Sequence, residues 1–230
     1  MATVERARDV AIDRARHWDG LYETRAGSGP SWFQRDPVTS LELITLLATE
    51  LSAPVIDVGG GSCCLAERLV ERGFSDVTVV DVSERALEAG RHRVGADPRV
   101  RWLRADILSW TPDRRFDLWH DRAVFHFLTG PEERAAYLAV LSAALFPGGN
   151  LVIGTFAEDG PTHCSGLPVA RYSPQELGEV LGPDFQAFEF RRELHMTPDG
   201  VGQPFTWLAG TFGSATHGAG TGRVDSESGG

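Results

Sequence analysis

The chain of 230 residues contains no lysine, and all 22 of its basic residues are arginine. Without lysine, the protein cannot form a lysine Schiff base, and it lacks the lysine that P-loop proteins place on nucleotide phosphates. Both kinds of chemistry are therefore excluded. Heavy use of arginine, alanine and glycine is typical of proteins from GC-rich bacterial genomes.

Cysteine is also scarce, with only three residues, Cys63, Cys64 and Cys164. An odd number of cysteines without a secretory signal is typical of reduced thiols rather than of a disulfide framework. The sequence has no CxxC pair and no zinc-ligand spacing. We therefore expect no structural metal.

Long hydrophobic runs and positive charge are lacking as well. No apolar run reaches the roughly 20 residues that cross a membrane. Met1–Arg16 alternates charge with alanine instead of forming the apolar centre of a signal peptide. The formal net charge of -10 disfavours a broad phosphate-binding surface. We expect a cytoplasmic protein without a membrane or nucleic-acid partner.

The chain is long enough for one domain with a core of ordinary size, which we assign to residues 1–213. Residues 3–18 and Pro37–Leu51 have the apolar spacing of amphipathic helices, with aromatic residues between them. We interpret residues 1–52 as a helical lid, with a packing strap as the alternative. Residues 53–213 form the expected core. Residues 214–230 contain little to bury, which predicts a disordered tail.

From residue 54, short apolar strands alternate with helices. Nearly continuous apolar strands of this kind are typical of a parallel sheet that is buried on both faces. The ligand of such a sheet binds outside the carboxyl ends of the strands, here where the first and fourth strands diverge. The expected strands are 54–58, 76–81, 100–104, 116–120 and 150–156, and the expected helices are 62–72, 84–93 and 131–146.

A helix at 174–181 and two strands, 185–195 and 205–212, are expected to complete the domain. The short turn Thr197-Pro198-Asp199-Gly200 between these two strands makes them an antiparallel hairpin. The predicted fold class is therefore α/β, doubly wound, with a mostly parallel seven-stranded Rossmann-like sheet and a C-terminal antiparallel hairpin.

The first strand runs into a glycine-rich turn, Asp57-Val58-Gly59-Gly60-Gly61. Glycine lets a ligand approach the backbone closely, and the N–H groups of the following helix point toward that ligand. Cys63 stands where a dinucleotide fingerprint needs its third glycine. A nucleoside-like cofactor without a pyrophosphate therefore fits better than NAD, and an NAD-dependent oxidoreductase is the less favoured enzyme class.

Two further carboxylates end the next two strands. Asp81 follows Asp57 by 24 residues, at the end of the second strand, where an acid can accept both hydroxyls of a ribose. Asp106 ends the third strand, where it can accept from the exocyclic amine of adenine with Ile107 beside the ring. The three acids predict one nucleoside site.

In this order the motifs resemble those of class I S-adenosylmethionine-dependent methyltransferases, over about residues 17–212. The resemblance implies an enzyme that uses S-adenosyl-L-methionine. The segments that carry it are Asp57-Val58-Gly59-Gly60-Gly61, Asp81-Val82-Ser83, Ala105-Asp106-Ile107, Phe116-Asp117-Leu118-Trp119-His120-Asp121-Arg122 and Pro147-Gly148-Gly149-Asn150-Leu151-Val152-Ile153.

The resemblance also implies roles for individual residues. Gly59 and Gly61 would face the methionine portion of the cofactor, and Asp57 its amino group. Asp81 would bind the ribose, and Asp106 with Ile107 the adenine. Val82, Asp121 and Trp32 are further candidate cofactor contacts.

Within this class, His17-Trp18-Asp19-Gly20-Leu21-Tyr22, Trp32-Phe33 and Asp121-Arg122-Ala123-Val124-Phe125-His126 are similar to a branch with METTL-type protein-lysine methyltransferases and many bacterial enzymes. The lysine-modifying members usually carry an acid where this chain has His126. We therefore expect methylation of a nitrogen, oxygen or sulfur atom of a small molecule. Protein-lysine methylation and a catalytically silent binding module with the same fold are the alternatives.

Methyl transfer needs alignment and water exclusion more than a base. If a base is used, Asp121, His126 and His195 are the candidates. Asp121 could instead cap the next helix, and the histidines could be packing residues. The candidate acceptor contacts are Trp18, Tyr22, Cys164, Arg171 and Tyr172. A thiol site for a soft metalloid, formed by the three cysteines with His163 and His195, is a further alternative.

Overall fold

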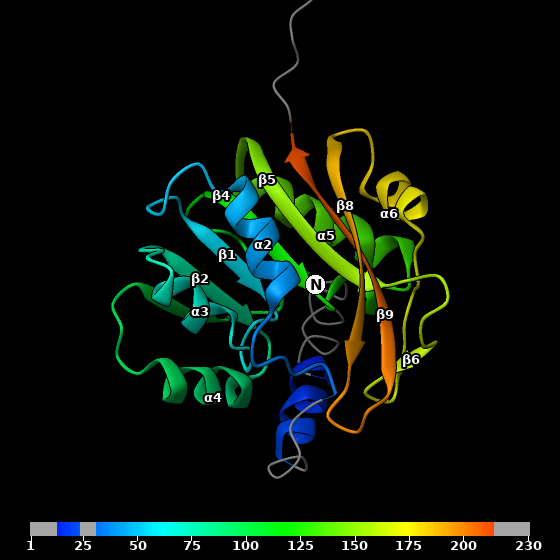
Figure 1. The fold of residues 1–230 in the computed structure, drawn as a ribbon, viewed down its shortest axis with the longest axis horizontal. Helices are drawn as coiled ribbons and strands as arrows, with labels where there is room; N and C mark the ends of the chain where they lie inside the picture. Colours follow the sequence, from blue (N-terminus) through cyan, green and yellow to red (C-terminus); the bar gives the residue numbers. More distant parts are fainter. Residues whose placement is uncertain (1–12, 24–30, 214–230) are drawn as a thin grey trace, which may run out of the picture.

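The computed structural model describes residues 13–23 and 31–213. Seven strands form one sheet in the order β3-β2-β1-β4-β5-β9-β8 (Figure 1). The first five strands run parallel, and β9 pairs antiparallel with both β5 and β8. The predicted fold class is thus confirmed. The strands are β1 (Val55–Val58), β2 (Val77–Asp81), β3 (Val100–Arg104), β4 (Phe116–Arg122), β5 (Leu145–Phe156), β8 (Phe185–Met196) and β9 (Gly202–Phe212).

Helices cover both faces of this sheet. Buried side chains of α2, α3 and α4 pack with one set of strand residues, and those of α5 and α6 pack with the other set (Figure 1). A two-stranded hairpin, β6 with β7, follows β5. The bounds are α2 (Val38–Leu47), α3 (Leu65–Glu71), α4 (Glu84–Val94), η1 (Phe125–Phe127), α5 (Pro131–Ala144), β6 (His163–Cys164), β7 (Leu167–Pro168) and α6 (Pro174–Leu181); residues 13–23 are also helical.

The order of the strands places the site. From β1 the chain proceeds to β2 and β3 on one side, and it then returns to β4 and β5 on the other side. The loops that leave β1 and β4 therefore run in opposite directions and open a crevice between them at the carboxyl edge. This is the position predicted from the sequence. None of the helices in the described ranges combines the length and apolarity that a bilayer-spanning segment requires.

Several element boundaries differ from those predicted. α3 begins at Leu65 instead of Ser62, because the chain turns from Gly60 to Cys63 through the hydrogen bond from Cys63 N to Gly60 O. β5 begins at Leu145, because this residue is extended and pairs with Phe116. The predicted helix at 131–146 consequently ends earlier, at Ala144.

The first predicted helix, residues 3–18, is described only from residue 13, and it continues to residue 23. Its first ten residues and the predicted tail at 214–230 lie outside the described residues. The second helix ends at Leu47 instead of Leu51. The assignment of residues 1–213 to one domain, with residues 1–52 as a lid, stays a prediction.

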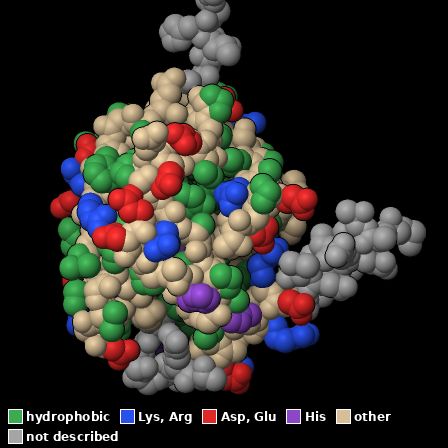
Figure 2. All heavy atoms as spheres, turned by 90° about the vertical axis from the view of Figure 1, so that its right-hand side faces the viewer, with side chains coloured by type: hydrophobic (Ala, Val, Ile, Leu, Met, Phe, Trp, Pro, Cys, Tyr) green, Lys and Arg blue, Asp and Glu red, His purple; other side chains and the backbone are tan. Residues whose placement is uncertain are grey.

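The edge strand β8 exposes apolar side chains, among them Phe188, Phe190 and Leu194. Figure 2 views the molecule from this side and shows hydrophobic groups interspersed with acidic and basic ones. Arg191 and Arg192 pair with Glu189 and Asp159 on the same region of the surface. The positive charges here are thus balanced locally by acids.

Two leucines of α2 offer a matched test of the packing. Leu43 is 1% exposed against the sheet, whereas Leu46 on the same helix is 57% exposed. We expect Leu43→Ala to lower the free energy of unfolding by about 2–5 kcal/mol, because it leaves a cavity. Leu46→Ala should change it by less than about 0.5 kcal/mol. Urea titration measures both values, and equal effects would contradict the described orientation of α2.

Candidate active site

A cleft, partly open to solvent, lies at the carboxyl ends of β1 to β4. Strand ends and the loops that follow them form its floor, and aromatic side chains from the N-terminal region form its cover. Ten of the residues that line it are Arg14, Trp18, Tyr22, Trp32, Gly59, Asp81, Val82, Asp106, Ile107 and Cys164.

The glycine turn after β1 is shaped by two close approaches. Gly59 has a φ of +68°, which residues with side chains rarely adopt. A Cβ at this position would lie 2.2 Å from Val124 Cγ2. A Cβ on Gly61 would lie 2.7 Å from Ala86 Cβ and 2.8 Å from Asp81 Oδ2. Both positions therefore need glycine to keep the turn against its neighbours.

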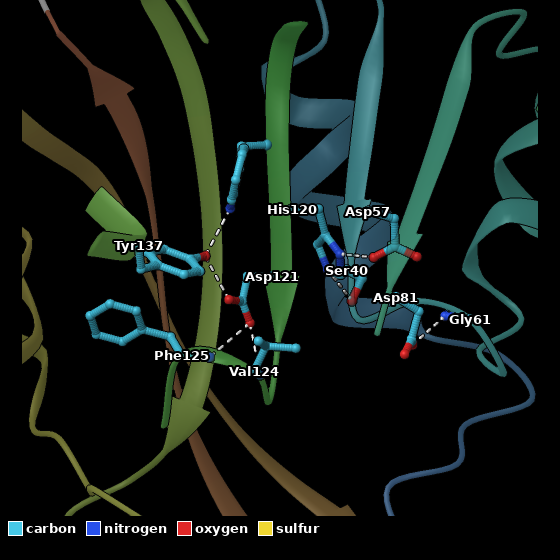
Figure 3. Close-up of polar contacts among 10 residues, drawn as sticks. Ser40, Asp57, Gly61, Asp81, His120, Asp121, Val124, Phe125 and Tyr137 are labelled. Atoms are coloured by element: carbon cyan, nitrogen blue, oxygen red, sulfur yellow. Dashed lines mark hydrogen bonds and ion pairs between the residues drawn. The ribbon is translucent and has the colours of Figure 1, made fainter. Parts of the chain in front are cut away.

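Asp81 is a buried carboxylate that two backbone N–H groups hold at the cleft. Gly61 N donates to Asp81 Oδ2 at 3.1 Å (Figure 3), and Ser83 N donates to Asp81 Oδ1 at 2.8 Å. Two carboxylate oxygens offer about four acceptor sites, so acceptor capacity remains for a ligand that donates two hydrogen bonds. Burial raises the pKa of Asp81 to about 6, although the two N–H groups oppose this shift. A diol is the matching ligand group.

Asp106 lies at the same rim and has an additional partner. Leu108 N donates to Asp106 Oδ1 at 3.0 Å. Arg14 donates to Asp106 Oδ2 through Nε at 3.1 Å and Nη2 at 2.7 Å. Ile107 lines the cleft next to this pair. The carboxylate is thus oriented at the position where the sequence predicts adenine.

The helix at residues 13–23 lies across three successive strand ends. Arg14 reaches Asp106 after β3, Asp19 accepts from Ser83 Oγ after β2 at 2.6 Å, and Tyr22 shares a hydrogen bond with Ser62 Oγ after β1 at 2.8 Å. These three contacts make the helix one wall of the cleft.

Arg14 was missed by the sequence reasoning, which selected Trp18 and Tyr22 from this helix. The four-residue spacing of positions 14, 18 and 22 places all three on one face of a helix. All three line the cleft. Helical periodicity applied to Trp18 and Tyr22 would thus have indicated Arg14 as well.

Aromatic rings cover the cleft in edge-to-face contacts. Trp18 meets Trp32 with centroids 5.7 Å apart and Phe127 with centroids 5.0 Å apart. Tyr22 meets Trp32 at 6.1 Å. The negative faces of such rings suit a cationic ligand, and their surface excludes water.

Asp57 lies outside the cleft, on the face of the sheet that carries α2. Its Oδ1 is 2.7 Å from His120 Nδ1, and His120 Nε2 is 3.0 Å from Ser40 Oγ (Figure 3). Asp57 Oδ2 has no hydrogen-bond partner among the described residues. This atom would lie 1.9 Å from a Cβ on Gly60, so the carboxylate packs directly under the turn. It lines a second, smaller cavity beside Gly59. Its predicted contact with the cofactor stays a prediction.

Asp121 points to the opposite face of the sheet. It accepts from Val124 N at 2.9 Å and from Tyr137 Oη at 2.6 Å (Figure 3), and the Tyr137 oxygen accepts from Trp119 Nε1 at 2.8 Å. Burial raises the pKa of Asp121 to about 6. These contacts stabilise the turn after β4, and the catalytic and cofactor-binding roles of Asp121 stay predictions.

The two candidate histidines lie away from the cleft lining. His126 is fully buried, its Nδ1 accepts from Phe156 N at 3.3 Å, and burial lowers its pKa to about 3. His195 donates from Nε2 to Ser31 O at 2.7 Å, and burial lowers its pKa too. Both contacts match the packing role that the sequence left open for them.

Only one of the three candidate residues from the loop region lines the cleft, namely Cys164. Arg171 is exposed and donates to Gly160 O, and Tyr172 is buried beside Phe125. Burial raises the pKa of Cys63 to about 12, so this thiol stays protonated. In the described ranges, no group of three or more histidine, cysteine or acidic side chains could hold a metal ion.

Residues 55–149 match the family model of a methyltransferase domain. Trans-aconitate 2-methyltransferase of Sinorhizobium medicae is 35% identical over 119 residues, which are 50% of this chain and 44% of that protein. Thiocyanate methyltransferase 1 of Brassica oleracea is 33% identical over 97 residues, 41% of each chain. The chain thus spans about half or less of the length of these curated relatives.

Solved structures share the whole fold. The 1,6-didemethyltoxoflavin-N1-methyltransferase of Burkholderia thailandensis, which was solved with 1,6-didemethyltoxoflavin and S-adenosylhomocysteine, superposes with a TM-score of 0.67. Its sequence is 23% identical, and the match covers 90% of this chain and 89% of that one. The fold resemblance that the sequence motifs indicated is confirmed.

The close approach at Gly61 gives a test of the turn. We expect Gly61→Ala to lower the free energy of unfolding by about 1–3 kcal/mol, because the new methyl group displaces Ala86 or the Asp81 carboxylate. Gly178→Ala in α6 is the matched control, since its Cβ would meet nothing within 4 Å. It should be neutral or stabilise by up to about 1 kcal/mol. Thermal and urea unfolding separate the two outcomes.

Proposed function

We propose, on the premise that residues 55–149 form a methyltransferase domain within the class I S-adenosylmethionine-dependent fold, that this protein methylates a small molecule. The methyl group comes from S-adenosyl-L-methionine, and it moves to a nitrogen, oxygen or sulfur atom of the acceptor. The protein is thus an enzyme with a nucleoside cofactor at the carboxyl edge of β1 to β4.

The observation that carries this proposal is the position of Asp81. Its carboxylate is pinned by Gly61 N and Ser83 N and retains acceptor sites on the cleft side. Asp106 and Ile107 lie one strand further, at a distance along the edge that suits the base of the same nucleoside. Gly59 lines the cleft and brings no side chain into it. This set of groups fits an adenosine that carries no pyrophosphate.

Bound S-adenosylmethionine supplies an electrophilic methyl group on a sulfonium. The protein side chains have to hold the acceptor in line with that methyl group and keep water out. Trp18, Tyr22 and Trp32 provide apolar cover for this purpose. No histidine lines the cleft in the described part of the chain, and His126 is neutral at physiological pH. We therefore assign the rate enhancement to alignment rather than to a general base.

A small acceptor is supported by the relatives. Their names specify trans-aconitate, thiocyanate and 1,6-didemethyltoxoflavin as acceptors. Protein-lysine methylation is the second candidate, because part of the sequence is similar to that branch. A catalytically silent module is the third. The lysine-free composition supports a bacterial source, and a cytoplasmic location is a further part of this proposal.

Transfer of a labelled methyl group decides between these candidates. The protein and S-adenosylmethionine with a labelled methyl group are incubated with bacterial extract, which is then divided into small-molecule and protein fractions. We expect the label in the small-molecule fraction, dependent on the added protein. Label in the protein fraction would favour protein methylation. No transfer, together with intact cofactor binding, would favour the silent module.

Binding of S-adenosylhomocysteine tests the cofactor site directly by calorimetry. Asp81→Ala removes two charge-assisted hydrogen bonds to the ligand, so we expect at least about 100-fold weaker binding. Asp76→Ala is the matched control, because Asp76 precedes the opposite end of the same strand and pairs with Arg114. It should change the Kd by less than about twofold. Equal Kd values for Asp81→Ala and the wild type would remove the assignment.

The same titration has a predictable pH dependence. Only the ionised Asp81 can accept from two hydroxyls, and its pKa in the free protein is about 6. The bound ligand favours the ionised form, so affinity is full above this pKa and decreases as the pH falls below it. Between about pH 7.5 and about pH 5 we expect the Kd to rise about tenfold. Asp81→Ala should abolish this dependence.

A further inference from the structure

Arg122 lies at the carboxyl end of β4 and is not one of the residues assigned to the nucleoside. Its side chain points to the face of the sheet that carries α2, and it lines both the main cleft and the smaller cavity beside Gly59. Arg122 Nη1 donates to Trp32 O at 2.8 Å. Its guanidinium lies over the ring of Phe205, with 4.6 Å from Cζ to the centroid. These two contacts hold the guanidinium in place.

The other two nitrogens of this guanidinium have no hydrogen-bond partner. Nε and Nη2 are both shielded from solvent and unpartnered within the described residues. They form one edge of the planar group, with two N–H bonds in parallel. That edge has the spacing of the two oxygens of a carboxylate.

No acid among the described residues contacts this guanidinium directly. Glu193 is the acid that acts most strongly on Arg122, but its two oxygens accept from Gln34 and Trp207. Within the described ranges, Arg122 forms no ion pair within 4 Å. Burial lowers the pKa of Arg122. A buried cation without a partner costs free energy, and an anionic ligand would offset that cost.

The position of Arg122 separates it from the nucleoside groups. Asp81 and Asp106 end β2 and β3, on one side of β1, whereas Arg122 ends β4 on the other side. One end of the cleft therefore holds two carboxylates with Arg14 paired to one of them, and the other end holds Arg122 without an acid within 4 Å. The basic end is bordered by Trp32, Phe127 and Cys164, which leaves an apolar surface for the body of an acceptor.

We propose that the free Nε and Nη2 edge of Arg122 binds a carboxylate of the methyl acceptor, so that the preferred substrates are small organic acids. This assignment rests on the proposed methyltransferase function and specifies its substrate class. A carboxylate held by two hydrogen bonds is partly neutralised and becomes a poorer nucleophile. It therefore anchors the acceptor, and a different atom of the acceptor receives the methyl group.

Benzoate and benzamide are matched probes, since they have the same shape and only benzoate is charged. Binding is measured by calorimetry and by quenching of tryptophan fluorescence, because Trp18 and Trp32 line the cleft. Each titration is performed on the free protein and with saturating S-adenosylhomocysteine. We expect the wild type to bind benzoate at least about tenfold more tightly than benzamide.

Arg122→Gln should abolish the preference for benzoate, and Arg122→Lys should restore part of it, because lysine keeps the charge but not the two-donor edge. Arg101→Gln is the control, because it also removes one positive charge but lies at an exposed residue that pairs with Asp113. It should keep the wild-type preference. All variants should bind S-adenosylhomocysteine within about twofold of the wild type.

The wild-type comparison does not depend on how well the variants fold. Equal affinity of the wild type for benzoate and benzamide would overturn the assignment. An unchanged preference in a folded Arg122→Gln protein would overturn it as well. If Arg122→Gln instead weakened S-adenosylhomocysteine at least tenfold, the guanidinium would hold the carboxylate of the cofactor and not that of the acceptor.

Failure of the proposed function would look different from failure of this inference. If the wild type did not bind S-adenosylhomocysteine and transferred no label, the methyltransferase proposal would fail. The preference for benzoate would still be measured on the free protein. If cofactor binding and transfer were intact but neutral acceptors were preferred, only the role of Arg122 would be wrong.

Discussion

The hydrogen bonds from Gly61 N and Ser83 N to the Asp81 carboxylate are the contacts on which the rest of the site depends. They tie the turn after β1 to the turn after β2, and they keep a buried carboxylate oriented toward the cleft. Burying a carboxylate is costly unless N–H groups compensate for the lost water. The raised pKa of Asp81 shows that two N–H groups compensate only in part. A ligand with two hydroxyls would donate the hydrogen bonds that the buried Asp81 carboxylate still lacks. Cofactor binding would therefore stabilise the carboxyl edge of the sheet.

Further hydrogen-bonded side chains connect this edge to both faces of the sheet. On β4, successive side chains alternate between faces, so His120 and Arg122 point toward α2 whereas Asp121 points toward α5. Asp57 and His120 are neighbours across β1 and β4 and connect to Ser40. The helix at residues 13–23 then closes the edge through Asp106, Ser83 and Ser62. Each strand end at the cleft is thus held by a side chain from a different part of the chain.

The cofactor half and the acceptor half of the cleft were not equally accessible to sequence reasoning. Gly59, Asp81, Asp106 and Ile107 follow strand ends at regular spacing, and all of them line the cleft. Acceptor residues such as Arg171 and Tyr172 were selected by their position in a loop, and they lie outside its lining. Arg14 and Arg122 were not selected, although both line it. A position in a loop does not indicate which way a side chain points, whereas a position at the carboxyl end of a parallel strand does.

The sequence by itself determined the order of strands and helices, the glycine turn and the acids at the carboxyl edge, because periodicity and backbone requirements are local properties. Only the tertiary structure decided which polar side chains face the cleft. His126 and Asp57 are close in sequence to residues that line the cleft, but their side chains point into the core. The pleat of the strands and the turn at Ala123 determine these side-chain directions. Arg122 reaches the cleft without a direct ion pair, and Glu193, 71 positions away, accepts hydrogen bonds from Gln34 and Trp207 instead. Contacts between residues so far apart in the chain are not encoded in any local pattern.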